Sequence, residues 1–375
     1  MQLDMVDFLV VGAGLCGLSV GAALSPHGRV VVLEQEDSPC YHSSGRSAAI
    51  FARNYGSDAI RQLTYASEPL YEQARVDGLF DALAPSARGI MFVAGQDAGP
   101  SVAPGPGQTC LSGAEVERIA PLLPAGRIAY GLWDDSARDI DVHAMQLGYA
   151  RLIKDGGGAV ITACPVTAAR PVDGGWMVEA GGRQFQARLV VNAAGAWADA
   201  VAGLFGARPV GLEPRRRSAA LIDPPVVAEG SVPFRDWPLV FDIGQTVYFK
   251  PEAGKLMLSP VDATPVPPHD CWAEDMDIAT AVDRFERLTG HEVRRVSHSW
   301  AGLRSFTPDE DPVIGFDPQL PGFLWLAGLG GSGIKTAPAT GAMAAALALG
   351  RPLPAGLSPE LVSRLSPARF AALEP

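Results

Sequence analysis

Phe8-Leu9-Val10-Val11-Gly12-Ala13-Gly14-Leu15-Cys16-Gly17 joins a short apolar run to a G-x-G-x-x-G motif. The apolar run predicts a buried strand, and the small residues from Leu15 to Leu24 predict a helix that starts inside the motif. In this setting the first glycine allows a tight turn, the second lets a pyrophosphate approach backbone N–H groups, and the third allows close packing of helix on strand. A second apolar run ends at Glu34, whose carboxylate can accept hydrogen bonds from ribose hydroxyls. The stretch predicts a Rossmann-like dinucleotide site at the positive end of a helix.

Later segments extend this α/β pattern over the whole chain. A buried strand that ends at glycine recurs at residues 189–195 and 323–328, whereas residues 238–260 hold three short apolar runs separated by turns, as in an antiparallel meander. We therefore expect a discontinuous nucleotide-binding domain with an inserted α+β substrate-binding domain, built on a mixed, mainly antiparallel sheet. The expected boundaries are 1–87, 141–212 and 300–375 for the first domain, and 88–140 and 213–299 for the second.

Composition excludes several classes of protein. Hydrophobic residues make up 47% of the 375 and charged residues 19%, which is enough apolar material for a large core and excludes intrinsic disorder. The net charge of −11 argues against a nucleic-acid partner. Five separated cysteines without a C-x-x-C pair predict neither a disulfide framework nor a metal site.

We expect neither a cleavable signal peptide nor a membrane span. The first residues lack a basic region followed by an apolar stretch, and the longest apolar run, Ala337 to Leu349, is shorter than the roughly 20 residues of a membrane span. We expect a cytoplasmic protein without an integral membrane span.

Two further segments suit a dinucleotide. Ser43, Ser44 and Ser47 surround Arg46 and offer hydroxyls and a cation to phosphates, although an exposed turn would look the same. Gly330, Gly331 and Gly333 flank Ser332 at the start of a predicted helix and leave its N–H groups unhindered.

With these segments the chain resembles the D-amino acid oxidase/glycine oxidase (DAO) family of FAD-dependent oxidoreductases. Within this family it is similar to the bacterial D-arginine dehydrogenases. The opening motif is followed, in the family's order, by five further marks: residues 44–49, 192–197, 248–251, 300–305 and 330–334.

The resemblance implies FAD as the cofactor, bound non-covalently. By likeness to the family, the residues expected to hold it are Gly12, Ala13, Gly14, Leu15, Cys16, Gly17, Glu34, Gln35, Ser43, Ser44, Gly45, Arg46, Ser47, Ala48, Val166, Ala194, Gly195, Trp197, Gly302, Gly330, Gly331, Gly333, Ile334, Lys335 and Thr336.

An α-amino acid presents a carboxylate, which a bidentate guanidinium and an added hydroxyl bind well. Arg304 is the leading candidate for the guanidinium and Tyr248 for the hydroxyl, since strand alternation sends Tyr248 away from its two neighbours. Each role has an alternative: Arg304 could instead form an ion pair with the acidic residues 309–311, and Tyr248 could simply pack against its neighbours. The expected substrate site comprises Arg304, Tyr248, Tyr55, Arg217, Ile50, Ile90 and Ser332, with a solvated edge for Arg217 and mere packing for Tyr55 left open.

The sequence departs from the D-arginine dehydrogenase pattern in the expected side-chain pocket. Ile50 stands where those enzymes carry a histidine, and no carboxylate lies between Arg88 and Val93, where they carry an acidic residue. A buried substrate cation would lack a counter-charge there, so we expect a preference for apolar or uncharged side chains.

The activity that the resemblance implies is oxidative deamination of D-amino acids to 2-oxo acids and ammonia, by hydride transfer from Cα to flavin N5. Electrons would pass on to a quinone, an electron carrier or oxygen. No side chain is assigned as a base. The alternatives are oxidation of secondary amines, such as N-alkyl glycines or cyclic imino acids, and a 2-hydroxy acid oxidoreductase or non-catalytic FAD-binding subunit.

The first prediction concerns the cofactor linkage. In relatives with covalent flavin a cysteine lies between the Arg304-like segment and the last strand, and residues 305–311 contain none. Denaturing the purified protein should release all of the yellow colour into the supernatant. Colour that stays with the precipitated chain would contradict this prediction.

Overall fold

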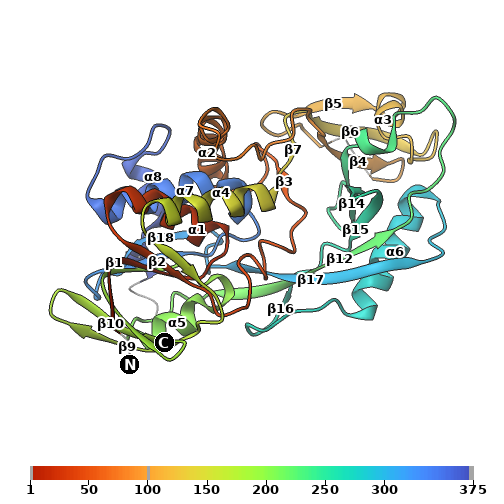
Figure 1. Ribbon diagram of the computed structural model, residues 1–375. Helices are drawn as coiled ribbons and strands as arrows, with labels where there is room; N and C mark the ends of the chain where they lie inside the picture. Colours follow the sequence, from red (N-terminus) through yellow and green to blue (C-terminus); the bar gives the residue numbers. More distant parts are fainter. Residues whose placement is uncertain (1–2, 99–101, 371–375) are drawn as a thin grey trace.

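The computed structural model describes residues 3–98 and 102–370 and contains two large sheets (Figure 1). The outermost ends of the expected nucleotide-binding domain therefore lie outside the described residues. The first sheet has the order β18-β19-β11-β1-β2-β8, with β10 and β9 added in antiparallel fashion beyond β11. Its strands are β1 (Leu3–Val11), β2 (Val30–Leu33), β8 (Ala159–Ile161), β9 (Val166–Val172), β10 (Gly175–Ala180), β11 (Arg183–Asn192), β18 (Val313–Phe316) and β19 (Phe323–Ala327).

The centre of this sheet is parallel, as the unbroken apolar runs predicted. β1 pairs in parallel with β2 and β11, β2 with β8, and β11 with β19. The carboxyl ends of β1, β2, β11 and β19 therefore meet at one edge. That edge carries the glycines predicted to bind a dinucleotide.

The glycines of the opening motif have two distinct roles. Gly12 has φ of +102°, and a Cβ there would lie 2.4 Å from the carbonyl oxygen of Ala193. A Cβ on Gly17 would lie 1.9 Å from the carbonyl oxygen of Gly12. The tight turn and the close helix packing expected of the first and third glycines are both seen.

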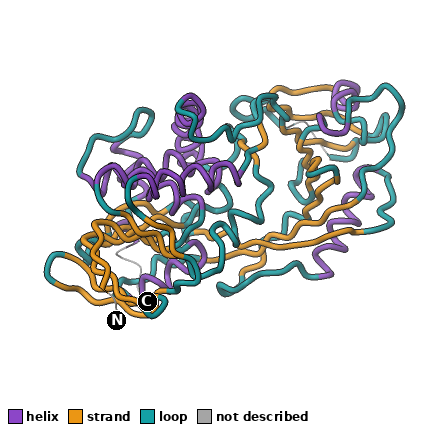
Figure 2. The backbone as a smooth tube through the Cα atoms, viewed as in Figure 1, coloured by secondary structure: helices purple, strands orange, loops and turns teal. Residues whose placement is uncertain are grey.

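Helices cover one face of the first sheet (Figure 2). α1 packs against α7 and α4, and α2 packs on α7. The other face is covered by the β9–β10 hairpin and α5. There the ring of Trp176 on β10 packs against Phe205 at the end of α5. The helices of this part are α1 (Leu15–Leu24), α2 (Asp58–Val76), α4 (Val142–Asp155), α5 (Ala198–Leu204), α7 (Gly333–Leu349) and α8 (Pro359–Leu365), with 3₁₀ turns at η1 (Ser25–His27), η2 (Gly195–Trp197) and η4 (Pro367–Phe370).

The second sheet is mixed and mainly antiparallel, with the order β16-β12-β15-β14-β13-β4-β6-β5 and β17 paired to β12. β13, β14 and β15 form the expected meander, and β13 pairs in parallel with β4. Its strands are β4 (Ile90–Gly95), β5 (Thr109–Ser112), β6 (Ile128–Asp134), β12 (Glu213–Ile222), β13 (Leu239–Asp242), β14 (Tyr248–Glu252), β15 (Lys255–Ser259), β16 (Thr264–Pro265) and β17 (Val296–Phe306).

Each face of the second sheet has a different neighbour. α6 (Asp275–Thr289) and α3 (Gly113–Ile119) pack on one face, where Phe285 contacts Phe249. The opposite face meets Ala52, Tyr55 and the short ribbon of β3 (Ile50–Phe51) and β7 (Arg138–Asp139). η3 (Phe234–Asp236) precedes β13.

Long paired strands link the two parts of the molecule. β12 and β17 run side by side from the first part toward the far end of the second (Figure 1). The fold class is confirmed, and the strands of each sheet come from the residue ranges expected for it, except that β17 crosses the expected boundary at residue 300. The domain boundaries stay a prediction.

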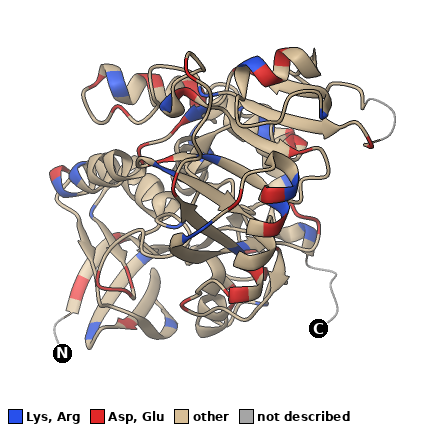
Figure 3. Ribbon diagram, turned by 90° about the vertical axis from the view of Figure 1, so that its right-hand side faces the viewer, with Lys and Arg blue, Asp and Glu red and all other residues tan. Residues whose placement is uncertain are grey.

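Charges of both signs are interspersed on the helices and loops in the view of Figure 3. Arg75 with Glu72 and Arg287 with Asp283 are examples of ion pairs along single helices. Within residues 3–98 and 102–370, no helix combines the length and the apolar character needed to cross a membrane.

The contact at Gly17 predicts the result of a minimal substitution. Gly17→Ala forces α1 away from the turn after β1, so the free energy of unfolding should fall by about 1–3 kcal/mol. Gly203→Ala is the matched control, since a Cβ at that position in α5 meets no atom within 4 Å and alanine favours a helix by up to about 1 kcal/mol. Urea unfolding of both variants measures the effect, and equal stabilities would contradict the prediction.

Candidate active site

A cavity of about 510 Å³ extends from the turn after β1 to the inner face of the second sheet. Its walls come from both sheets, from the loop that follows β2 and from the start of α7. Most of the residues singled out in the sequence line it, although they lie far apart along the chain.

Glu34 lies at one end of the cavity with its carboxylate held in place. One oxygen accepts the N–H of Ala13 at 2.8 Å and the other accepts the N–H of Glu36 at 3.1 Å. These bonds join the end of β2 to the turn after β1 and fix the orientation in which the carboxylate lines the cavity.

The serines of the loop after β2 form hydrogen bonds within the protein. Ser44 Oγ accepts the N–H of Leu15 at 3.1 Å, at the start of α1. Ser43 donates to the carbonyl of Leu303 at 2.7 Å, so the loop is tied to β17 as well. The start of α1 has no acidic residue in its first turn, which suits an anion.

Arg46 also lines the cavity, but most of its guanidinium is engaged. It pairs with Asp270 at 2.6 Å and donates to the carbonyls of Tyr41, Cys271 and Ala301. Of five N–H donors, these contacts leave one. Arg46 thus links three segments, and its expected contact with phosphate stays a prediction.

Four of the residues predicted to bind the cofactor do not line the cavity, for reasons of packing. Ala13 and Thr336 are fully buried, Gly17 packs on the turn, and a Cβ on Gly45 would meet the carbonyl of Cys40 at 2.5 Å. These four residues pack behind the residues that line the cavity and support them. The predicted residues that do line the cavity are Gly12, Gly14, Leu15, Cys16, Glu34, Gln35, Ser43, Ser44, Arg46, Ser47, Ala48, Val166, Ala194, Gly195, Trp197, Gly302, Gly330, Gly331, Gly333, Ile334 and Lys335, together with all seven of the expected substrate site.

Arg304 reaches the cavity from β17 without an acidic partner among the described residues. It donates to the carbonyl of Gly330 at 2.8 Å, and a Cβ on Gly331 would lie 2.2 Å from its Nε. Burial, and then the nearby Arg217, lower the pKa of Arg304 to about 10, so it stays charged at neutral pH. The guanidinium needs the space that glycine leaves.

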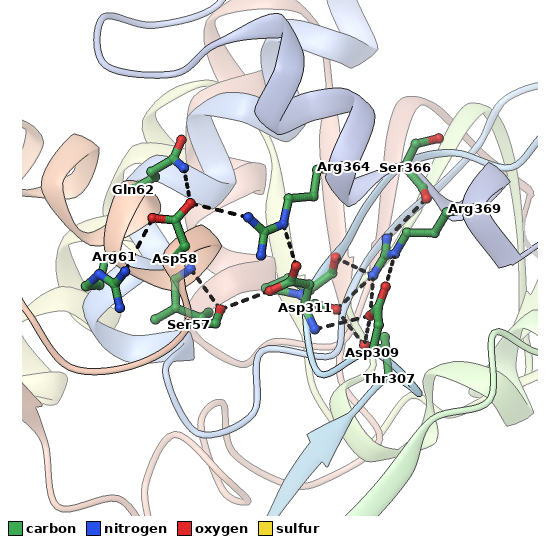
Figure 4. A network of polar contacts seen from close by, with 12 residues as sticks. Ser57, Asp58, Arg61, Gln62, Thr307, Asp309, Asp311, Arg364, Ser366 and Arg369 are labelled. Atoms are coloured by element: carbon green, nitrogen blue, oxygen red, sulfur yellow. Dashed lines mark hydrogen bonds and ion pairs between the residues drawn. The ribbon is translucent and has the colours of Figure 1, made fainter.

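The alternative ion pair of Arg304 with residues 309–311 is not formed. Asp309 pairs with Arg369, Glu310 with Arg215, and Asp311 with Arg364. The contacts of Asp309 and Asp311 belong to a network that also includes Ser57, whose hydroxyl donates to Asp311 at 2.9 Å (Figure 4). The network holds the segment after Tyr55 against the segment after Arg304.

Tyr248 faces the cavity, whereas Val247 and Phe249 are packed in the core on the other side, as strand alternation predicted. Arg215, Arg216 and Arg217 are consecutive on β12, and of these three only Arg217 lines the cavity. Its Nε donates to the carbonyl of Asp262 at 2.6 Å, so part of its guanidinium is already bound.

The wall around Tyr248 is apolar and aromatic. Ile50 and Ile90 lie there, and Tyr55 stacks near Phe241 with ring centroids 6.2 Å apart. Among the described residues that line the cavity, Glu34 is the only carboxylate. Sequence reasoning missed Leu239, Phe241, Met257 and Trp300; the alternation along β13 and β15 was a signal for the first three.

Lys335 is 4% exposed and lies on the third residue of α7. Its Nζ donates to the carbonyls of Ala52, at 3.0 Å, and Tyr55. Burial, followed by the charges of Arg304 and Arg61, lowers the pKa of Lys335 to about 7. The side chain thus fastens the segment that carries Tyr55, a contact that the sequence did not reveal.

Comparisons with known proteins agree on one family. The family model of the FAD dependent oxidoreductases (DAO) matches residues 7–347. Human mitochondrial sarcosine dehydrogenase is 27% identical over 249 residues, which cover 60% of this chain and 25% of that protein. Glycine oxidase of Bacillus licheniformis is 44% identical over 66 residues, or 18% of each chain. The chain thus matches a quarter or less of the length of these curated relatives.

Solved structures share the fold over nearly the full length. L-proline dehydrogenase from P. horikoshii has a TM-score of 0.81 and 19% identity, covering 99% of both chains. Glycine oxidase from Geobacillus kaustophilus has a TM-score of 0.77 and 21% identity, covering 93% of this chain and 96% of that one.

The low pKa of Lys335 predicts a pH-dependent stability. Between about pH 7 and 10.5 the unfolded chain binds a proton at this lysine that the folded chain does not, so the free energy of unfolding rises with pH. Lys335→Met removes this contribution. The stability of wild type relative to the variant should therefore rise from pH 7 to 9, by at most about 1.4 kcal/mol per pH unit. Urea unfolding at fixed FAD concentration measures it, and a difference independent of pH would contradict the low pKa.

Proposed function

The chain belongs to the DAO family of FAD dependent oxidoreductases, and from this premise we propose that it deaminates D-amino acids oxidatively to 2-oxo acids and ammonia. Apolar or uncharged side chains are the preferred substrates in this proposal. The observation that carries it is the Arg304 guanidinium, which lacks an acidic partner among the described residues and shares a cavity with Tyr248 and an apolar wall.

The residues of the cavity fit FAD. Gly14 lines the cavity at the start of α1 without a side chain to cover the N–H groups there, and the carboxylate of Glu34 is held in place at the end of the neighbouring strand β2. The N-cap of α7 is Ser332, and its side chain does not cap the helix, so the positive end of α7 is open to an electron-rich ring. In the proposal Glu34 binds ribose, the turn before α1 binds the pyrophosphate, and the Gly330–Gly333 segment meets the flavin.

Substrate binding follows from the charges in the cavity. Arg304 and the Tyr248 hydroxyl bind the α-carboxylate through charge-assisted hydrogen bonds, which fixes the orientation of Cα. Bound FAD supplies the acceptor for the two electrons that leave Cα as the C=N bond forms. Tyr55 and Phe241 exclude water from the reacting centre.

The apolar wall supports the choice of side chain. Ile50, Ile90 and Leu239 offer no counter-charge to a cation, whereas burial of a branched or aromatic side chain there gains about 1.5–3 kcal/mol. The same carboxylate site also suits secondary amines. Sarcosine dehydrogenase and L-proline dehydrogenase among the similar proteins support this second candidate.

A substrate screen separates the two candidates. The FAD-loaded enzyme is assayed with D-leucine, L-leucine, N-methylglycine and proline, using an artificial electron acceptor alongside oxygen consumption. We expect D-leucine to give the highest kcat/KM. A higher value for L-leucine or for a secondary amine would overturn the proposal.

Arg304 is tested by substitution. Arg304→Ala should lower kcat/KM for D-leucine by about ten- to a hundred-fold, because a charge-assisted hydrogen bond contributes about 1.5–3 kcal/mol. FAD should remain bound, as its absorbance shows. Arg215→Ala is the control, since Arg215 pairs with Glu213 and Glu310 and does not line the cavity. Unchanged kinetics of the Arg304 variant would exclude its role.

A further inference from the structure

Lys335 is a buried amine on the cavity wall that substrate binding through Arg304 and Tyr248 does not use. Arg304 from β17 and Arg61 from α2 are the charged groups that act on its pKa, and the ring centroid of Tyr55 lies 5.6 Å from Nζ. Tyr71 from α2 and Cys16 from α1 donate to the carbonyls of the two residues that precede Lys335. Among the described residues, no Asp or Glu side chain forms a hydrogen bond or ion pair with Lys335. Its surroundings favour the neutral amine.

The hydrogen bonds of Lys335 fit that neutral form. A neutral primary amine has two N–H groups and one lone pair, whereas an ammonium group has three N–H groups. The carbonyls of Ala52 and Tyr55 accept two N–H groups. The third position on Nζ has no protein partner within the described residues, so it is available as a lone pair.

An arriving substrate changes this balance. At neutral pH an amino acid carries a carboxylate and an ammonium group, and oxidation at Cα requires a neutral amine. A carboxylate bound at Arg304 adds a negative charge near Lys335 and so favours the protonated lysine. Transfer of one proton from the substrate ammonium to Lys335 gives both the neutral amine and the protonated lysine.

We propose that Lys335 accepts the proton that the substrate ammonium loses on binding, an inference that rests on the proposed function. One N–H bond of the ammonium breaks and its electron pair stays on the substrate nitrogen. A new N–H bond forms from the lone pair of Nζ, so charge and protons are conserved without a further reactant. When the product carboxylate leaves, Lys335 returns its proton to solvent.

Another candidate acceptor lies in the wrong place. His42 lines the cavity, but its ring pairs with Glu36 at 2.8 Å and packs on Trp197, with centroids 4.5 Å apart. Glu36 follows Glu34 by two residues and donates its N–H to that carboxylate, so the ring of His42 is engaged at the end of the cavity that Glu34 lines. Lys335 is instead directly tied to the segment of Tyr55, beside the proposed substrate.

The inference is tested first by proton counting. FAD-loaded enzyme is titrated at pH 8 with 4-methylpentanoate, which is leucine without its amine, by calorimetry in buffers of different ionisation enthalpy. Because this ligand brings no ammonium proton, wild type should take up about one proton from the buffer per ligand bound. Lys335→Met should bind without uptake. Lys255→Met, a surface control paired with Asp223, should behave like wild type.

Kinetics then show whether the proton acceptor matters for turnover. For Lys335→Met, kcat/KM for D-leucine should fall about tenfold for each pH unit below the ordinary pKa of the substrate ammonium, while wild type keeps its activity down to about pH 7. Lys335→Arg keeps a positive charge but cannot accept a proton, so it should follow the methionine variant. If Lys335→Arg instead matched wild type, charge alone would explain the role of Lys335 and the inference would fail.

The outcomes separate this inference from the proposed function. Binding of 4-methylpentanoate to wild type without proton uptake, or equal uptake by wild type and Lys335→Met, overturns the role of Lys335 and leaves the carboxylate site standing. Failure of 4-methylpentanoate to bind, with no oxidation of any amino acid, overturns the proposed function itself. A wild-type titration without proton uptake overturns the role of Lys335 even if a variant does not fold.

Discussion

The turn between β1 and α1 approaches the backbone after β11 so closely that Gly12 cannot carry a side chain, and α1 lies so close to the same turn that Gly17 cannot carry one either. This contact sets the position of α1 over the sheet, and α7 and α4 pack in turn on α1. Because the carboxyl ends of β1, β2, β11 and β19 meet at the same edge, the contact also determines the shape of the cavity wall. The shape of this end of the cavity thus depends on one place where two backbones nearly touch.

The other end of the cavity depends on segments that are distant in sequence. Arg304 occupies space that Gly331 leaves open, and Lys335 fastens the backbone of Ala52 and Tyr55. Outside the cavity, Asp311 receives hydrogen bonds from Ser57 and Arg364 (Figure 4). The segment with Tyr55 is therefore held from both sides, which keeps an aromatic ring over the proposed substrate position at little conformational cost.

Electrostatics distinguish the cavity from the rest of the protein. Arg46, Arg216 and Arg364 all pair with carboxylates, and their ion pairs connect neighbouring segments. Lys335 is buried and Arg304 is half-buried, both without such partners among the described residues, which lowers both of their pKa values and costs stability. A protein that keeps two such groups beside one cavity gains a site in which an incoming carboxylate is strongly favoured.

The sequence by itself determined the arrangement at the end of the cavity that Glu34 lines. Gly12, Gly17 and Glu34 act within one strand–helix–strand unit, so local spacing was enough to assign their positions, and alternation along β14 was enough to turn Tyr248 toward the cavity. Only the tertiary structure decided which arginines remain without acidic partners. Arg46 pairs with Asp270, which is distant in sequence. Asp309 and Asp311, which are close to Arg304 in sequence, pair with other arginines instead. The tertiary structure also decided the position of Lys335, whose low pKa and bonds to Ala52 and Tyr55 join residues about 280 positions apart. Charge compensation and burial depend on such distant neighbours, and a linear pattern does not contain them.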